Sequence, residues 1–276
     1  MRSYTLAHLS DLHLGLSAGA ERMAAALCRT LLAAKIDHVI VSGDITHRGR
    51  RDELARFQQI FHPLLKTRRM TVVPGNHDRL GDDVRSEISG GLRVRSTKVD
   101  GLCIVCVDST GPHNRSWLAS HGHLAEDEID QIETFVEASS RDDLTIVTLH
   151  HHPLPLPEDT LPERLVSRLG SSSNAELLRG PELVRRLCGR CDLLLHGHRH
   201  VPREATLCLN ERPRPLRIFN AGSSTELGLI RVFPHARGRL TADPYWISAQ
   251  LDRAPAAPKT RSSQAIRSAV RAFGLF

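Results

Sequence analysis

The sequence predicts an α/β protein, a four-layer αββα sandwich in which two mixed β-sheets pack face to face and helices cover the outside. Short apolar runs alternate with amphipathic helical patterns, which is typical of a largely parallel sheet. Further strand-like segments follow one another with short turns, so they need a second sheet. Of 276 residues, 40% are hydrophobic and 25% are charged, a composition that excludes a disordered, collagenous or membrane-spanning chain.

The strands of the predicted parallel sheet are short and apolar along their whole length, as expected when helices and a second sheet cover both faces. They are Tyr4–Leu9, His38–Val41, Met70–Val73, Leu144–Leu149 and Leu193–Leu195. Amphipathic helices, with apolar residues three and four positions apart, are expected at Arg22–Ala34, Asp52–Leu65, Ala125–Ala138 and Pro181–Cys188. Strands that are joined through such helices run parallel.

A second set of strands has turns between its members in place of helices. Leu92–Val99 and Leu102–Val107 flank Asp100-Gly101, a dipeptide that predicts a tight hairpin turn. Later strands are expected at Glu204–Leu209, Leu216–Phe219, Leu229–Phe233 and Arg239–Ser248. With these strands, residues 1–250 form one domain.

Residues 251–276 are expected to form a basic amphipathic C-terminal tail. After a Pro/Ala linker, Ser262–Phe276 places apolar residues on one helical face and Arg267 and Arg271 elsewhere. The tail can make a weak contact with a membrane surface or a partner subunit, or it can dock onto its own domain.

The cysteines and the charge indicate the compartment and exclude some partners. Six cysteines are too few for a disulfide scaffold, and no signal-peptide pattern opens the chain, so we expect a cytoplasmic protein. The pairs Cys103/Cys106 and Cys188/Cys191 are too far apart for a zinc ribbon and are expected to be core thiols. A net charge of +6 attracts phosphorylated substrates but indicates no specific nucleic-acid site.

Polar side chains of the kinds that bind metals follow five of the predicted strands, each where the strand ends. They are Asp11 and His13; Asp44; Asn76, His77 and Asp78; His150, His151 and His152; and His196, His198 and His200. The carboxyl ends of parallel strands share one edge of a sheet, where ligands gather. We therefore expect these five clusters to converge on one site, with small glycines at the turns, namely Gly43, Gly75 and Gly197.

The types of ligand indicate the metal, and their number indicates two ions. Carboxylate, imidazole and amide oxygen without thiolate favour manganese, iron or zinc. The candidate ligands are Asp11, His13, Asp44, Asn76, His151, His198 and His200. These are too many for one ion but suit two divalent ions that share a carboxylate, for which Asp44 is the natural bridge. His150 and His152 remain alternatives to His151, because the sequence alone does not show which of three consecutive histidines at a strand end is the ligand.

In this order, Asp11-x-His13, Gly43-Asp44, Gly75-Asn76-His77-Asp78, His151 before Pro153, and Gly197-His198-x-His200 resemble the motifs of the calcineurin-like metallophosphoesterase superfamily. The resemblance spans residues 5–200. It implies that one ion binds Asp11, His13, Asp44 and His200, and the other Asp44, Asn76, His151 and His198. His151 is chosen because the family's histidine usually stands two residues before the proline. The chain is most similar to the bacterial cyclic nucleotide and glycerophosphodiester phosphodiesterase branch.

The resemblance implies an enzyme, a metal-dependent hydrolase. It would cleave phosphodiester bonds of the cyclic nucleotide or glycerophosphodiester type through a hydroxide that bridges the two ions. The substrate would be a phosphorylated small molecule or lipid. His77 is expected to protonate the leaving oxygen, with Asp78 orienting its ring, although a purely structural His77 is the alternative. Other possibilities are a phosphomonoesterase or lipid-linked pyrophosphatase of the same superfamily, and a metal-free binding module.

Overall fold

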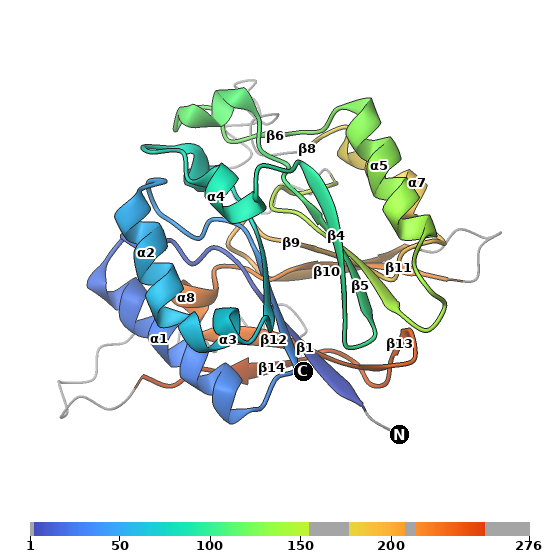
Figure 1. The fold of residues 1–276 in the computed structure, drawn as a ribbon, viewed down its shortest axis with the longest axis horizontal. Coiled ribbons are helices and arrows are strands. Elements are labelled where there is room, and N and C mark those ends of the chain that lie inside the picture. Colours follow the sequence, from blue (N-terminus) through green and yellow to red (C-terminus); the bar gives the residue numbers. More distant parts are fainter. Residues whose placement is uncertain (1–2, 155–176, 208–213, 252–276) are drawn as a thin grey trace, which may run out of the picture.

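The computed structural model describes residues 3–154, 177–207 and 214–251 of the chain. Within these residues two six-stranded sheets lie face to face (Figure 1). Residues 155–176 lie outside the described part. So do all but the first residue of the tail predicted at 251–276 and the last two residues of the strand expected at Glu204–Leu209. No helix of that part is long and apolar enough to cross a membrane.

The first sheet has a parallel centre. Its strands are β1 (Tyr4–Leu9), β2 (His38–Ser42), β3 (Met70–Val73), β12 (Leu229–Ala236), β13 (Arg239–Leu240) and β14 (Tyr245–Ser248). They are arranged in the order β13-β12-β1-β2-β3, and β14 also pairs with β12. β1, β2 and β3 run parallel, whereas β12 is antiparallel to β1. The ends of β1, β2 and β3 therefore lie at the same edge.

The second sheet repeats this arrangement. Its strands are β4 (Val94–Val99), β5 (Leu102–Val107), β7 (Leu144–Thr148), β9 (Leu193–His196), β10 (Arg203–Leu207) and β11 (Leu216–Asn220). They are arranged in the order β10-β11-β9-β7-β5-β4, with the inner four parallel and the two edge strands antiparallel. Both sheets are mixed, as predicted.

Three buried clusters separate the four layers. Between the sheets, Leu6 and Ile40 of the first pack with Ile104, Ile146 and Leu195 of the second. On the outer face of the first sheet lie α1 (Ala18–Ala33), α2 (Arg51–Ile60) and α3 (His62–Lys66); on that of the second lie α5 (Glu126–Glu137) and α7 (Gly180–Leu187) (Figure 1). Successive strand residues face opposite sides, so these strands bury both faces. The predicted αββα sandwich is confirmed.

Two predicted elements are each divided in the structure. The helix expected at Asp52–Leu65 is two helices, because α2 ends at Ile60 and α3 begins at His62. Pro63 has no backbone N–H and is tolerated only in the first turn of a helix, which is where α3 places it. The strand expected at Arg239–Ser248 is β13 and β14, which both pair with β12.

Short elements that carry little periodicity were not expected from the sequence. They are α4 (Arg85–Ser89), α8 (Ser224–Leu227), the 3₁₀ turns η1 (His77–Arg79) and η2 (Pro112–Arg115), and the two-residue strands β6 (Gly122–His123) and β8 (Leu177–Leu178). Each has five residues or fewer, too few to show a repeat of 3.6. They lie in loops that follow the strands, and several border the site described below.

The hairpin and the cysteines agree with expectation. Between β4 and β5, Asp100 and Gly101 have φ values of 49° and 74°, as a two-residue turn of type I′ requires. The thiols of Cys103, Cys106, Cys188 and Cys191 are free and buried. These cysteines therefore belong to the core.

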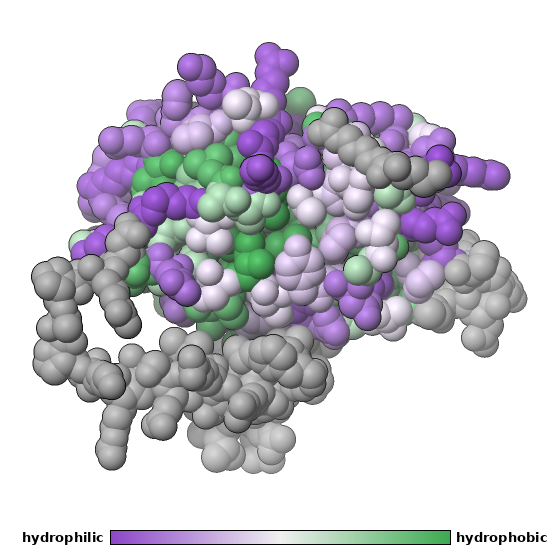
Figure 2. Space-filling view, turned by 90° about the horizontal axis from the view of Figure 1, so that it is seen from below, coloured by the Kyte–Doolittle hydropathy of each residue, from purple (hydrophilic) through white to green (hydrophobic). Residues whose placement is uncertain are grey.

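The surface seen in Figure 2 is mixed in polarity. Hydrophobic residues occupy the middle of that face, and hydrophilic side chains surround them. Exposed apolar residues are ordinary on globular proteins, so this area alone assigns no function.

Candidate metal centre

Five loops that follow β1, β2, β3, β7 and β9 meet at one edge of the sandwich. The backbone N–H of Asp11 donates to the Gly43 carbonyl oxygen at 3.1 Å, and that of Gly197 donates to the His150 carbonyl oxygen at 3.1 Å. Between the sheets, the His198 N–H donates to the Asp11 carboxylate at 3.1 Å. Segments nearly 190 residues apart in the chain thus lie in contact, as the position of their residues at the strand ends predicts.

The first group of possible metal ligands consists of Asp11, His13 and His200, whose donor atoms lie within 4.8 Å of one another. The Nε2 atoms of the two histidines are 3.0 Å apart, and His200 Nε2 is 3.5 Å from Asp11 Oδ1. Two imidazole nitrogens that face each other beside a carboxylate suit a cation between them, because each nitrogen then keeps its lone pair for the ion.

The second group consists of Asp44, His150 and His198. The amide oxygen of Asn76 joins it, at 3.1 Å from His150 Nε2 and 3.0 Å from His198 Nδ1. Asp44 Oδ2 is 3.3 Å from His150 Nε2 and 3.7 Å from His13 Nε2. Asp44 therefore lies between the two groups, the position that a shared ligand requires.

The sequence favours His151 as a ligand, but the structure places His150, not His151, beside Asp44 and His198. The His151 ring binds the hydroxyl of Ser109 through Nδ1 at 2.8 Å, and its buried Nε2 has no hydrogen-bond partner among the described residues. The His150 ring instead turns toward Asp44. Three consecutive histidines offer the same chemistry, and their directions depend on how the backbone leaves the strand.

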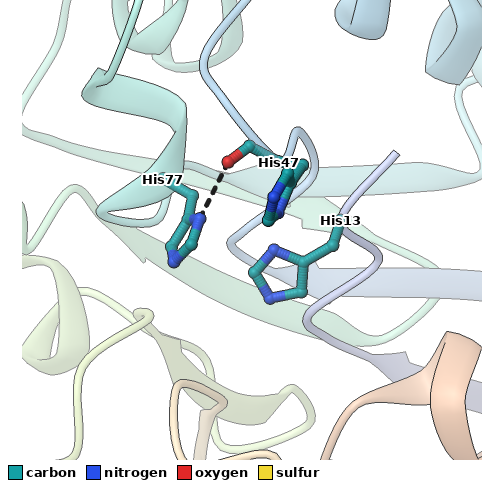
Figure 3. Close-up of side chains that lie close together, drawn as sticks. All are labelled: His13, His47 and His77. Carbon is teal, nitrogen blue, oxygen red and sulfur yellow. Dashed lines mark hydrogen bonds between the residues drawn. The ribbon is translucent and has the colours of Figure 1, made fainter. Parts of the chain in front are cut away.

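The expected contact between Asp78 and the His77 ring is also corrected. His77 Nδ1 donates to the carbonyl oxygen of His47 at 2.9 Å (Figure 3). The buried Asp78 carboxylate instead accepts hydrogen bonds from the backbone of Ile45, Thr46 and Gly75 and from the Thr46 hydroxyl. Asp78 thus joins the loop after β2 to the loop after β3 and does not touch the reacting groups. His77 remains beside the site, with Nε2 3.9 Å from Asp44 Oδ2.

The backbone at the site is held in a conformation that non-glycine residues rarely adopt. Five of the candidate ligands have positive φ: Asp11 (52°), His13 (46°), Asp44 (49°), His198 (76°) and His200 (54°). Such a conformation costs on the order of 1–3 kcal/mol per residue and persists only where the surrounding structure enforces it. The strained residues lie in the loops after β1, β2 and β9, and their side chains point into the same small volume.

Glycines allow the close approach of these loops. Gly43 has a φ of 95°, and a Cβ there would overlap the His150 ring. A Cβ on Gly197 would overlap the Ser10 hydroxyl and the Asp11 carboxylate, and one on Gly75 would overlap Asp44. The expected role of the three glycines at the strand ends is confirmed by this close approach.

Burial and charge set the protonation of the site. Burial lowers the pKa of His13 to about 3 and holds the pKa of His198 well below its usual range. Burial also disfavours a charged His150, but the carboxylates of Asp44 and Asp11 outweigh it and raise its pKa to about 9. Burial disfavours ionisation of Asp44, yet His150 and the neighbouring imidazoles hold its pKa well below the usual range. The rings of His13 and His198 are therefore neutral at pH 7, as metal ligands must be.

The donor set fits two divalent cations. It contains two carboxylates, four imidazoles and one amide oxygen, with no thiolate, and most of these groups are buried. Such a set suits manganese, iron or zinc. Of the seven residues proposed from the sequence, the structure brings six together and replaces the seventh by its neighbour.

Three further residues border the site and were not singled out from the sequence. His47 lies with His13 and His77, and the three rings converge (Figure 3). The carboxylate of Glu226 in α8 lies 3.2 Å from His200 Nδ1, and Ser109 binds His151. A hydrogen bond such as that between Glu226 and His200 orients a metal-binding ring. Of the three, only His47 could have been found from the sequence, since it stands three residues after Asp44 in the same loop.

The comparisons with known proteins agree with this geometry. The calcineurin-like phosphoesterase family matches residues 4–202. A protein of Pseudomonas aeruginosa named 3′,5′-cyclic adenosine monophosphate phosphodiesterase CpdA is 27% identical over 250 residues, which cover 85% of this chain and 84% of that protein. The glycerophosphodiester phosphodiesterase GpdQ of Enterobacter lignolyticus is 27% identical over 216 residues, which cover 67% of this chain and 69% of that protein.

A solved structure shares the fold. A dimetal phosphatase from Danio rerio superposes with a TM-score of 0.59 over 90% of this chain and 99% of that chain, with 11% sequence identity. At that identity the likeness concerns the arrangement of helices and strands alone.

Proposed function

Since the chain belongs to the calcineurin-like phosphoesterase family and is a metal-dependent hydrolase, we propose that it cleaves phosphodiester bonds of the cyclic nucleotide or glycerophosphodiester type. The names of the relatives from Pseudomonas aeruginosa and Enterobacter lignolyticus support the diester class. The observation that carries the proposal is the pair of donor groups that Asp44 joins.

The two groups would hold two divalent ions, which we propose to be manganese, iron or zinc. One set of ligands is Asp11, His13, Asp44 and His200, and the other is Asp44, Asn76, His150 and His198. When bound, such a pair stabilises negative charge on the phosphoryl oxygens and lowers the pKa of a water molecule that attacks phosphorus in line with the leaving group.

His77 would donate a proton to the leaving oxygen. A carbonyl oxygen only accepts, so the hydrogen bond to the His47 carbonyl fixes the His77 proton on Nδ1. When the ring is protonated, the second N–H is on Nε2, which faces Asp44 at 3.9 Å. The His77 side chain is 19% exposed, so a bound substrate can reach it. Asp78 would act through the backbone that positions His77.

The charges around the site favour a diester over a monoester. A monoester carries an additional negative charge, which calls for a cationic side chain near the terminal phosphate. Arg79 and Arg115 both pair with Asp83, at 3.3 and 2.9 Å. This pairing holds their charges away from a substrate.

Rates on matched substrates test the proposal. The protein loaded with Mn²⁺ should hydrolyse bis(p-nitrophenyl) phosphate with a kcat/KM at least about tenfold above that for p-nitrophenyl phosphate, as expected if Arg79 and Arg115, which both pair with Asp83, do not bind the terminal phosphate of the monoester. Cyclic nucleotides, glycerophosphodiesters and nucleotide-linked lipids then identify the natural class. Equal or faster hydrolysis of the monoester would overturn the diester proposal.

The shared carboxylate is tested by metal analysis. Asp44→Asn should remove both ions together and reduce turnover to background, because both groups need this side chain. Asp127→Asn, on the exposed side of α5, is the matched control and should keep both ions. An Asp44→Asn protein that retains two ions and its activity would exclude the shared ligand.

A further inference from the structure

We propose that Trp117 is a specificity-determining residue whose indole stacks on the planar base of a nucleotide phosphodiester. The inference rests on the proposed function and deepens it, since it assigns the part of the site that would select a base-containing substrate. Trp117 lies in the loop between η2 and β6, far in sequence from every metal-ligand motif.

The indole lies next to the reacting groups. Its ring centre is 4.8 Å from that of His77, with the planes at 88°, and 5.4 Å from that of His47, with the planes at 63°. His77 in turn faces Asp44, and the rings of His13, His47 and His77 converge in Figure 3. The Trp117 indole, which we call the platform, is thus separated by one ring, that of His77, from the carboxylate that the two metal groups share. This position is near where the alcohol side of a bound diester must lie.

Trp117 has accessible ring surface. The residue is 56% exposed although it contacts two imidazoles. An exposed indole offers a π-face that any base can stack on, whichever base it is. The neighbouring Leu118 is 87% exposed but offers no such face.

Hydrogen bonds and a ring contact fix the loop that carries Trp117 on both sides of this residue. Asn114 accepts the Gly111 N–H at 2.6 Å, and its side-chain amide donates to the carbonyl oxygens of Ala119 and His121 at 2.7 and 3.1 Å. The His113 ring stacks on His121 with centres 3.8 Å apart. A loop held in this way loses little conformational freedom when a ligand binds, so the platform is preorganised.

The chemistry around Trp117 favours a base over the other groups that a diester can carry. Glycerol and ethanolamine have no π-face, so they gain nothing from stacking. A quaternary ammonium can lie against an indole, but here it would also lie beside a site that holds two divalent cations, which repel it. A neutral planar base has a π-face and is not repelled by the cations.

Binding of a base-free counterpart tests the platform without turnover. The chain has two tryptophans, so Trp246→Phe leaves Trp117 as the only indole, and it keeps an aromatic ring beneath Arg231. In the Mn²⁺-loaded protein, 5′-AMP should quench the Trp117 fluorescence and bind about tenfold more tightly than ribose 5-phosphate, as stacking of one base predicts. Equal affinities without quenching would overturn the proposal.

Kinetics then test specificity. Trp117→Ala should raise KM for 3′,5′-cyclic AMP about tenfold with little change in kcat, because one stacking contact is lost. KM for glycerophosphoethanolamine and glycerophosphocholine should change less than about twofold, since neither headgroup stacks. Trp117→Phe should restore most of the affinity for the nucleotide, and Leu118→Ala is the control that should change none of these constants.

The outcomes separate this inference from the proposed function. Equal losses for the nucleotide and the glycerophosphodiesters, or a loss for glycerophosphocholine alone, would overturn the role of Trp117 in base stacking. If the unaltered protein hydrolyses no diester while 5′-AMP still quenches Trp117 and outcompetes ribose 5-phosphate, the proposed function fails and the stacking site stands.

Discussion

At the scale of single residues, the three histidines after β7 have the same side chain and three different surroundings. The His150 ring meets Asp44 and Asn76, the His151 ring meets Ser109, and the His152 ring packs on His196 with centres 4.7 Å apart. The three histidines thus differ in their contacts only because the backbone points their side chains in different directions.

Paired substitutions of these neighbours identify the ligand. His150→Ala should lower the metal content from about two ions to about one per chain and reduce turnover, since an ordered ligand is lost. His151→Ala should keep both ions and lose stability instead, because it leaves a buried void. Metal analysis and thermal unfolding measure both effects. The reverse pattern would return the ligand role to His151.

Protonation of His150 predicts that metal affinity depends on pH. Its pKa, raised to about 9, means that the metal-free ring carries a proton at neutral pH, and an ion must displace it. Affinity for Mn²⁺ should therefore increase from pH 6 to pH 8, by up to about tenfold per pH unit for one displaced proton. Calorimetry in buffers of different ionisation enthalpy counts the released protons. An affinity that is constant over this range would contradict the raised pKa.

At the scale of elements, the loops after β2 and β3 are held together by one buried carboxylate. Asp78 accepts four hydrogen bonds from Ile45, Thr46 and Gly75. These loops present Asp44 and Asn76, so Asp78 supports the site without touching a substrate. Burial raises the pKa of Asp78 to about 6, with a contribution from Asp44.

Asp78→Asn should therefore destabilise the fold and weaken the metal site together. An amide nitrogen would replace one acceptor and face backbone N–H donors, which costs on the order of 2–3 kcal/mol. Thr46→Val removes one of the four hydrogen bonds to Asp78, together with the one that the Thr46 hydroxyl accepts from the Gly49 N–H. It leaves the carboxylate in place and serves as the milder comparison, with a loss of about 1–2 kcal/mol. Thermal unfolding and metal content are the measurements. An unchanged melting temperature in Asp78→Asn would show that the two loops are held by other contacts.

At the scale of the whole molecule, the candidate metal ligands come from both sheets. Asp11, Asp44 and Asn76 follow strands of the first sheet, whereas His150, His198 and His200 follow strands of the second. Ions bound between them would link the halves of the sandwich at one edge. The same edge carries strained backbone, which the ions would help to hold.

Removal of the ions should consequently lower the thermal stability of the protein. An ion at 100 times its Kd stabilises the folded state by about 2.7 kcal/mol, and about 1 kcal/mol shifts the melting temperature by roughly 2–4 °C in a chain of this size. Unfolding should be compared in excess Mn²⁺ and in a chelator, with His150→Ala as a variant that should respond less. Identical melting temperatures in both conditions would mean that the ions do not link the sheets.

The sequence indicated most of the fold because its signals are local. Continuously apolar runs such as Tyr4–Leu9 give strands that are buried on both faces, and Asp100-Gly101 gives a hairpin turn. Where a helical pattern is interrupted, as by Pro63, the sequence did not show that one helix ends and another begins. The tiny elements near the site were missed because they have no repeat to detect.

The sequence by itself determined which residue types stand at the strand ends, and therefore that Asp11, Asp44, Asn76 and His198 would meet, since parallel strands end at a common edge. Only the tertiary structure decided that His150 and not His151 faces them, that Asp78 supports a loop, and that Trp117 borders the site. Those facts depend on side-chain direction and on contacts between distant loops, which are set when the two sheets pack and which no short stretch of sequence encodes.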